Sequence, residues 1–131
     1  MQTILVCEDD TNNRRGFCEM LTLLGYRVLQ AATGKKAIEI FKTQNRPVDL
    51  LISDVDLPDV SGTDVALALS ESSPRMPILF VSGNPIAIWS RRDLCNFKRL
   101  PSALVDFIEK PFRLLTLQNK ISDLLNHASA I

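Results

Sequence analysis

The sequence predicts an α/β fold in which helices cover both faces of a five-stranded parallel sheet. Five strand-length apolar runs recur along the chain, and amphipathic segments with helical spacing separate them. Single Gly and Pro residues interrupt this alternation, as at Gly25, Pro47 and Pro77. Right-handed crossovers restrict such a chain to a few doubly wound strand orders, and sheets of this kind bind ligands at the carboxyl ends of their strands.

The five predicted strands are short runs dominated by apolar residues. In chain order they are Ile4 to Cys7, Arg27 to Ala31, Leu50 to Ser53, Ile78 to Val81 and Val105 to Ile108. Turn-forming residues follow the third run, at Leu57-Pro58-Asp59 and Ser61-Gly62. A helical segment follows each run, so the chain consists of five β-α units.

Capping residues mark the starts of the first two predicted helices. Thr11 or Asp10 caps the first helix, and Gly25 ends it. Thr33-Gly34 opens the second helix. A short third helix is indicated by the apolar positions Val65, Ala66 and Leu69.

The last two helices differ in how clearly the sequence marks them. Asn84 at a cap and Pro85 at the first helical position predict that the fourth helix begins there and continues through Trp89 toward Leu94. The closing helix carries the apolar stripe Leu114, Leu117, Ile121, Leu124 and Leu125. This stripe is shorter than two heptads, so it predicts packing on the sheet in preference to a coiled-coil seam.

Length and composition favour one domain, residues 1–131, with enough apolar residues for a single core. Fifteen basic and fifteen acidic residues cancel, and they are scattered, so binding to nucleic acid or to an anionic membrane is not expected. No segment resembles a membrane span or a secretory signal, and the three cysteines form no CxxC pair. We therefore expect a soluble cytoplasmic protein whose partners are proteins or small ions.

Charged residues follow three of the predicted strands. Glu8-Asp9-Asp10 follows the first, Asp54 the third and Lys110-Pro111 the fifth. Any one of these residues alone would be read as a solvated loop residue. Together at one sheet edge, carboxylates a few ångströms apart repel by roughly 4 kcal/mol per pair at an effective dielectric near 20. The set therefore predicts a hard divalent cation, for which Mg²⁺ is the natural choice and Mn²⁺ the alternative.

Four separated motifs carry a resemblance to a known family: residues 4–10 (ILVCEDD), residues 49–62 (DLLISDVDLPDVSG), Ser82-Gly83, and residues 106–112 (DFIEKPF). In this order they resemble the receiver domain of two-component response regulators. The resemblance covers nearly the whole chain. It implies a flavodoxin-like, three-layer α/β/α fold with strand order 2-1-3-4-5.

The resemblance also implies roles for the acidic residues. Asp54 resembles the phosphoacceptor, which attacks the phosphorus of a phosphohistidine and becomes an acyl phosphate. Asp9 resembles the direct Mg²⁺ ligand and Glu8 the acid that holds the ion through water, while Asp54 and the main-chain carbonyl of Asp56 complete the protein contacts. The side chains of Asp56 and Asn84 lie where the family tunes dephosphorylation.

Three further positions match the family's phosphate-contacting and switch residues. Lys110 resembles the lysine that meets the phosphoryl group, and the bond before Pro111 is usually cis in the family. Ser82 and Phe107 resemble the switch pair, in which a hydroxyl bonds the phosphoryl group and an aromatic ring turns inward. Phe107 lacks the phenolic hydroxyl that many relatives carry, and the alternative is a core ring that does not move.

The segment from Ser82 to Lys110 is longer than in the family by more than a helical turn. Trp89 with Arg91 and Arg92 is predicted to form part of a partner surface; the alternative is that Trp89 belongs to the core and the arginines are solvated. The resemblance implies a histidine kinase or histidine phosphotransfer protein as phosphoryl donor, a downstream protein target, and a monomer or phosphorylation-dependent dimer. A stand-alone receiver and a module of a larger regulator or hybrid kinase both remain open.

Two other functions fit part of the pattern. Asp54 and Asp56 resemble the DxD of haloacid-dehalogenase-type phosphatases, but Pro58 and the position of the motif on the third strand disagree with that family. The second alternative is an adaptor of the same fold that acts without phosphorylation. Because the acids, the hydroxyl and the lysine are all present, we expect a stoichiometric phosphoacceptor with slow self-dephosphorylation and not an enzyme with turnover.

Overall fold

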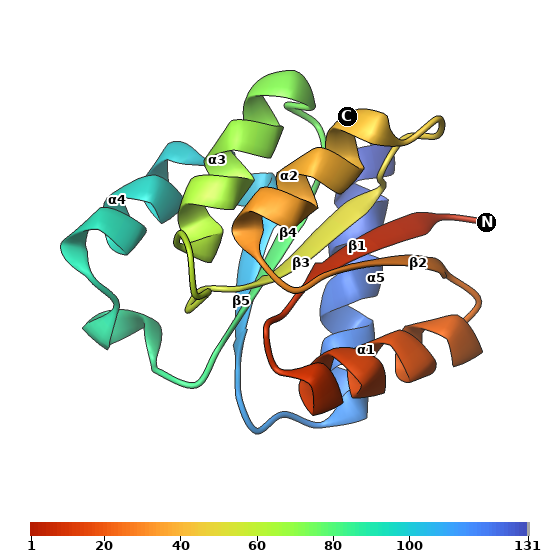
Figure 1. The fold of residues 1–131 in the computed structure, drawn as a ribbon, viewed down its shortest axis with the longest axis horizontal. Coiled ribbons are helices and arrows are strands. Elements are labelled where there is room, and N and C mark those ends of the chain that lie inside the picture. Colours follow the sequence, from red (N-terminus) through yellow and green to blue (C-terminus); the bar gives the residue numbers. More distant parts are fainter. Residues whose placement is uncertain (131) are drawn as a thin grey trace.

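The described part of the chain, residues 1–130 of a computed structural model, alternates strands and helices (Figure 1). The strands are β1 (Thr3–Cys7), β2 (Arg27–Ala31), β3 (Leu50–Asp54), β4 (Ile78–Ser82) and β5 (Val105–Glu109). The helices are α1 (Thr11–Leu23), α2 (Gly34–Thr43), α3 (Gly62–Ser72), α4 (Arg91–Arg99) and α5 (Leu114–Ala130), with the short 3-10 helices η1 (Ile86–Ile88) and η2 (Ser102–Leu104) on either side of α4. Each strand agrees with its predicted range to within one residue at either end.

All five strands are parallel and lie in the order β2-β1-β3-β4-β5, which confirms the predicted flavodoxin-like fold. Helices α1 and α5 cover one face of the sheet, and α2, α3 and α4 cover the other (Figure 1). Alternate residues of β1 point to opposite faces of the sheet: Ile4 and Val6 pack with α1 and α5, and Leu5 packs with α2 and α3. The sheet is therefore the middle of three layers, and its central strands β1, β3 and β4 are fully buried.

Local capping explains where the first three helices begin. The side chains of Asp10, Thr33 and Ser61 each accept a hydrogen bond from a main-chain N–H in the first turn of α1, α2 and α3. Gly25 follows α1 with φ of 95°, a conformation that glycine adopts without steric cost. The starts of α1 and α2 agree with the predictions, and Asp10 is the observed cap of the two candidates for α1. For α3, whose start was not predicted, Ser61 is the cap.

The predicted start of the fourth helix is wrong. Pro85 precedes only the short turn η1, and the main chain of Trp89 is extended, with ψ of 155°. The α-helix begins after Ser90, whose side chain accepts a hydrogen bond from the N–H of Asp93. Trp89 is buried in the core, as described below, and its extended main chain separates η1 from α4, so the helix begins at the Ser90 cap instead of at Asn84-Pro85.

Four of the five residues of the predicted stripe on α5 pack on the sheet: Leu117, Ile121, Leu124 and Leu125 are buried in the core beneath β1, β3 and β4. Leu114, the first residue of the helix, is 51% exposed, so the prediction is wrong for that position. Cys7 and Cys18 are also buried, and burial raises the pKa of the Cys7 thiol to about 12. Within residues 1–130, no helix has the length and apolar character that a membrane crossing would need.

Candidate functional site

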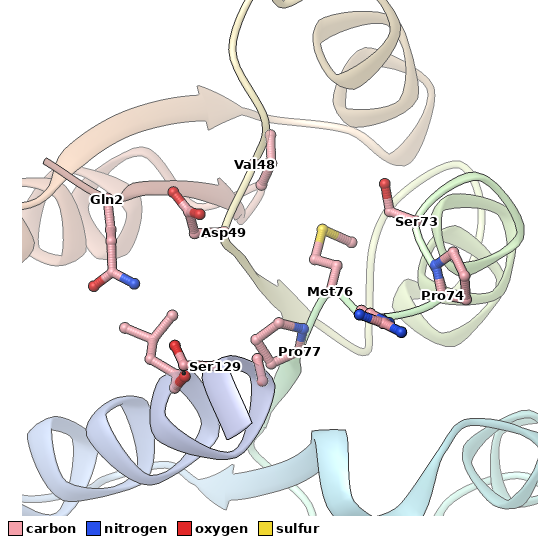
Figure 2. Close-up of a pocket in the computed structure, with 11 residues that line it drawn as sticks. Gln2, Val48, Asp49, Ser73, Pro74, Met76, Pro77 and Ser129 are labelled. Atoms are coloured by element: carbon pink, nitrogen blue, oxygen red, sulfur yellow. Dashed lines mark hydrogen bonds between the residues drawn. The ribbon is translucent and has the colours of Figure 1, made fainter. Parts of the chain in front are cut away.

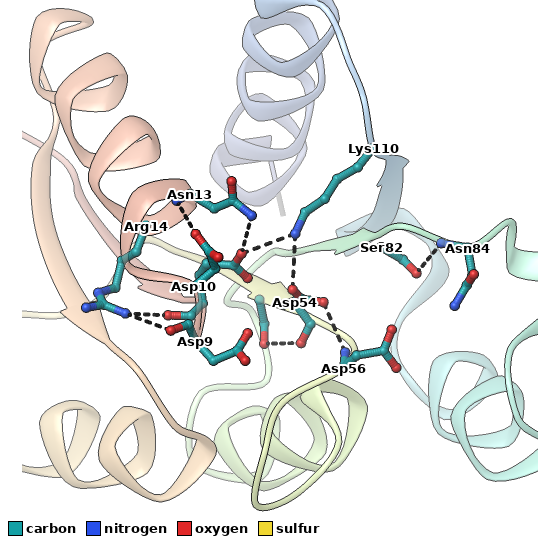
Figure 3. A network of polar contacts seen from close by, with 11 residues as sticks. Asp9, Asp10, Asn13, Arg14, Asp54, Asp56, Ser82, Asn84 and Lys110 are labelled. Atoms are coloured by element: carbon teal, nitrogen blue, oxygen red, sulfur yellow. Dashed lines mark hydrogen bonds and ion pairs between the residues drawn. The ribbon is translucent and has the colours of Figure 1, made fainter.

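Three carboxylates meet at the edge of the sheet where the carboxyl ends of β1 and β3 lie side by side. Glu8 and Asp9 follow β1 directly, and Asp54 ends β3. Oxygen atoms from the three side chains lie within 4.8 Å of one another. Glu8 is 3% exposed and Asp54 8% exposed, whereas Asp9 faces solvent. The predicted cluster thus forms a single acidic site, open on the Asp9 side (Figure 3).

Lys110 joins two of these acids. Its Nζ atom lies 3.2 Å from Glu8 Oε1 and 3.2 Å from Asp54 Oδ2, forming an ion pair with each (Figure 3). The Lys110 main-chain N–H donates to the carbonyl of Ser82 at 2.7 Å, which fixes the end of β5 beside the end of β4. The peptide bond between Lys110 and Pro111 is cis. The β5–α5 connection therefore directs one ammonium group into the acidic site.

The charges in the site do not balance. Burial and the neighbouring Asp54 carboxylate raise the pKa of Glu8 to about 7, although Lys110 and a hydrogen bond from Asn13 act in the opposite direction. Burial lowers the pKa of Lys110, but attraction to Asp54 and Glu8 outweighs it and the pKa is raised. Burial and Asp54 also raise the pKa of Asp56. The residues present, hard oxygen donors with excess negative charge, fit a hard divalent cation such as Mg²⁺.

The loop after β3 folds back on Asp54. The main-chain N–H of Asp56 donates to Asp54 Oδ1 at 3.0 Å, so the two oxygens of Asp54 have different partners, one an amide and one an ammonium. Gly62 donates from its main chain to the carbonyl of Val55 at 2.9 Å, which closes the loop. Asp59 then accepts hydrogen bonds from the main chain of Gly34 and Lys35 at the start of α2. The Asp56 N–H therefore orients the Asp54 side chain, and Asp59 ties the same loop to α2.

Ser82 lies on the strand next to Asp54. The register of β3 and β4 pairs Asp54 with Val81, so Ser82 is one residue further toward the carboxyl edge. Its side chain is buried, and its oxygen accepts a hydrogen bond from the main-chain N–H of Asn84 at 3.0 Å. Asn84 is exposed on the loop that follows (Figure 3). The structure thus brings both residues to the edge that holds the acids.

Phe107 belongs to an aromatic cluster that links β4, β5 and α4. The members are Phe80, Trp89, Phe97 and Phe107, with adjacent ring centroids 5.8 to 6.1 Å apart. Trp89 also donates from its indole nitrogen to the carbonyl of Asn84 at 3.2 Å. The cluster therefore connects the loop after Ser82 to the ring of Phe107 through Trp89.

The predicted partner surface is wrong for Trp89, which is 7% exposed and belongs to this cluster. The Trp89 side chain packs inside the domain and not on its surface, because the extended main chain after η1 places the indole ring under α4. Arg91 and Arg92 are exposed, and Arg92 forms an ion pair with Asp64 of α3 at 3.0 Å. The core alternative for Trp89 is the one observed.

Sequence reasoning missed several polar contacts around the site. Asn13 donates to the Glu8 carboxylate, and Arg14 donates to the Glu8 main-chain carbonyl at 2.8 Å. On the other side, Asp93 of α4 accepts hydrogen bonds from the hydroxyls of Ser61 and Thr63 at the start of α3. The cap at Asp10 was the one available signal, because it places Asn13 in a first helical turn that faces back toward Glu8.

A hollow of about 410 Å³ lies at the opposite edge of the sheet, near the amino ends of β1, β3 and β4 (Figure 2). Asp49, in its lining, accepts a hydrogen bond from the Thr3 main chain at 2.7 Å. This carboxylate joins the start of β1 to the segment before β3. The contact is structural, and the hollow has no part in the acidic site.

Comparisons with known proteins agree with this geometry. Residues 4–122 match the family model described as "Response regulator receiver domain". The response regulator receiver protein CpdR of Brucella abortus is 30% identical over 126 residues, which are 95% of this chain and 98% of CpdR. Sensor kinase CckA of the same organism is 32% identical over 94% of this chain, but the chain spans only 12% of the length of CckA.

A solved structure gives the same result. Response regulator protein TrrA from Thermotoga maritima, crystallised in complex with Mg²⁺ and BeF, superposes with a TM-score of 0.77 at 26% identity, over 95% of this chain and 99% of TrrA. The family model and CpdR each cover most of the chain, and the strand order and the acidic edge agree with them. The chain therefore belongs to the response regulator receiver domains, the phosphoacceptor modules of two-component signalling systems.

Proposed function

We propose that Asp54 is the phosphoacceptor of this receiver domain. The observation that carries the proposal is the Lys110 ammonium group held 3.2 Å from both Asp54 and Glu8, with Asp9 in the same cluster. An incoming phosphoryl group is anionic, so a carboxylate can accept it only where positive charge offsets the repulsion. Glu8 and Asp54 both contact that charge, but Asp54 is also held by the Asp56 N–H through its second oxygen, so both of its oxygens are positioned at the end of β3.

The reaction moves a phosphoryl group from a nitrogen to an oxygen. A carboxylate oxygen of Asp54 attacks the phosphorus of a phosphohistidine on a histidine kinase or phosphotransfer protein. The new P–O bond gives an acyl phosphate, and the electron pair of the broken P–N bond returns to the donor's imidazole. The Asp56 N–H and Lys110 hold the two Asp54 oxygens beforehand, so positioning supplies much of the catalysis.

Glu8, Asp9, Asp54 and the main-chain carbonyl of Asp56 would hold Mg²⁺, or Mn²⁺ as the alternative. The bound ion neutralises charge that develops on the phosphoryl oxygens. By the family resemblance, Asp9 would contact the ion directly and Glu8 would hold it through water; Asp9 is the exposed member of the cluster and Glu8 the buried one. The excess of acidic over basic side chains, three carboxylates to one lysine, supports this assignment.

Residues at the ends of the neighbouring strands β4 and β5 respond to phosphorylation of Asp54. Lys110 and Ser82 contact the phosphoryl oxygens, and Phe107 moves with the loop that carries Ser82. The side chains of Asp56 and Asn84 border the acceptor and set the rate at which water removes the phosphoryl group. Asp54 is modified once in each molecule, so the protein is a stoichiometric acceptor without turnover of its own.

The proposal also covers the domain organisation, location and partners of the protein. Residues 1–131 act as one receiver domain in the cytoplasm, as a monomer or as a dimer that forms on phosphorylation. The input partner is a histidine kinase or phosphotransfer protein, and the output is a downstream protein target. Arg91 and Arg92, both exposed on α4, remain candidates for that output surface.

Labelling with acetyl phosphate tests the assignment. Mg²⁺-dependent gain of one phosphoryl group in the wild type, lost in Asp54→Asn and on chelation with EDTA, is the expected result. Labelling that persists in Asp54→Asn would reject Asp54 as the acceptor. In the same tubes, repeated turnover of a phosphate ester that Asp56→Asn abolishes would instead indicate a phosphatase of the DxD type.

A further inference from the structure

We propose that Asn13 is a positioning residue for the metal site: its side-chain amide holds the carboxylate of Glu8 in place for the divalent ion. The inference rests on the proposed role of Glu8. Asn13 Nδ2 donates to Glu8 Oε1 at 3.1 Å, and Figure 3 shows the amide turned from α1 toward the acidic cluster. The residue itself is exposed and lies outside the acidic motif, five positions after Glu8.

Two residues in the first turn of α1 donate hydrogen bonds to Glu8, one to its side chain and one to its main chain. Asp10 caps the helix by accepting from the main-chain N–H of Asn13 at 2.8 Å, and side chains in a first turn lean back toward the residues before the helix. This geometry directs the Asn13 amide to the Glu8 carboxylate and the Arg14 guanidinium to the Glu8 carbonyl at 2.8 Å. Both the side chain and the main chain of Glu8 are therefore fixed by one helical turn.

The helix does not need the Asn13 amide. The cap uses the main-chain N–H of Asn13, which any residue other than proline would supply. Among the hydrogen bonds of the described residues, the one that the Asn13 side chain makes is directed at Glu8. Loss of the amide should therefore disturb Glu8 and leave α1 intact.

The chemistry of the donor also fits this role. Glu8 Oε1 receives two donors, Lys110 and Asn13, which approach from the β5–α5 connection and from α1. Lys110 also contacts Asp54 and, in the proposed reaction, meets the phosphoryl group. A second cation at the Asn13 position would repel the divalent ion. A neutral amide orients Glu8 without that repulsion.

Asn13→Ala and Asn12→Ala form a matched pair, since both asparagines are exposed in the first turn of α1 and, of these two, Asn13 is the one that donates a hydrogen bond to Glu8. Mg²⁺ affinity is measured without any phosphodonor, by calorimetry or by competition with Mn²⁺ observed by electron paramagnetic resonance. Loss of a residue that orients a metal-binding group typically lowers affinity about tenfold or more, and this is expected for Asn13→Ala alone. Wild-type affinity in Asn13→Ala overturns the inference.

Two further measurements separate positioning from general damage. In the Glu8→Ala background, which removes the oxygen that Asn13 contacts, Asn13→Ala should lower Mg²⁺ affinity by a much smaller factor than in the wild type. An equal factor in both backgrounds also overturns the inference. In metal-free protein, the side-chain amide protons of Asn13 should exchange more slowly than those of Asn12. If the wild type binds no Mg²⁺, the proposed function itself fails, which is a different outcome.

Discussion

Gly62 packs directly on the main chain of Asp54. A Cβ atom at position 62 would lie 1.9 Å from the Asp54 carbonyl oxygen and 2.8 Å from the hydroxyl of Ser53, distances that no side chain tolerates. The first residue of α3 is therefore glycine because the acceptor strand and the next helix approach here without room for a methyl group. The contact therefore constrains the main chain of the residue that carries the acceptor carboxylate.

Gly62→Ala should lower stability and impair phosphorylation together. Moving the Asp54 main chain to relieve the clash costs about 1–3 kcal/mol, as for other overpacked sites, and shifts the acceptor away from Lys110. Urea unfolding and acetyl phosphate labelling measure the two effects. Gly16→Ala is the control, because nothing lies within 4 Å of its added methyl group in α1; it should raise stability by up to about 1 kcal/mol and label normally. Equal behaviour of the two variants would contradict the packing argument.

Asp54→Asn should stabilise the metal-free protein by about 1 kcal/mol, because it removes one of two buried carboxylates that share a single lysine. The amide can still accept from the Asp56 N–H, so the loop keeps its contact. Unfolding in EDTA measures the gain, and added Mg²⁺ should reduce it by stabilising the wild type. Asp123→Asn, on the exposed side of α5, changes the net charge equally and should stay within about 0.5 kcal/mol of the wild type. A destabilised Asp54→Asn would show that the repulsion is already offset.

The parts of the fold that follow from local pattern were predictable, and those that depend on distant partners were not. Short apolar runs and caps such as Thr33 place the strands and most helices, because periodicity and capping are local properties. The start of α4 depends on the burial of Trp89 against Phe80, which lies on a strand nine residues earlier. Local signals at Asn84-Pro85 cannot contain that information.

The candidate site shows the same division. Glu8, Asp54 and Lys110 were predictable as a group, since parallel strands bring their carboxyl ends to one edge. The amide of Asn13 reaching Glu8 was not, because asparagine in a first helical turn has many local uses. The contact of Asp93 with Ser61 and Thr63 was also missed, because it joins residues about thirty positions apart.

Asp59 predicts a pH effect on stability that is independent of the metal site. Its carboxylate accepts hydrogen bonds from the main chain of Lys35 and Gly34, and these hold the pKa of Asp59 below its ordinary value. A carboxylate with a lowered folded-state pKa stabilises the protein above its unfolded-state pKa, and this contribution disappears as pH falls through the folded-state pKa. Asp59→Asn should therefore be less stable than the wild type at pH 7, with the difference shrinking below about pH 4.

Unfolding of both proteins in EDTA at several pH values measures this difference. Because Asp59 is exposed, the loss at neutral pH should be small and should decrease with added salt. Carboxyl resonances of Asp59 followed by NMR give its titration directly. A constant difference between the two proteins from pH 7 to pH 3 would show that shape, and not charge, links Asp59 to α2.

Trp89 should report the proposed switch by its fluorescence, since it is the sole tryptophan and joins the loop after Ser82 to Phe107. Its indole N–H bonds the Asn84 carbonyl at 3.2 Å, and its ring packs edge-on to Phe107 with centroids 6.0 Å apart. If a phosphoryl mimic draws Ser82 inward, the Asn84 carbonyl and the Phe107 ring both move relative to the indole, which changes its emission. We expect a shift when Mg²⁺ and beryllium fluoride are added together, as in the TrrA complex. The shift should be absent with Mg²⁺ alone. It should be strongly reduced in Ser82→Ala, because that variant lacks the buried hydroxyl that would transmit the movement. An unchanged spectrum in a wild-type sample that has bound beryllium fluoride would show that Phe107 is a fixed core ring, and that this receiver signals through another part of its surface.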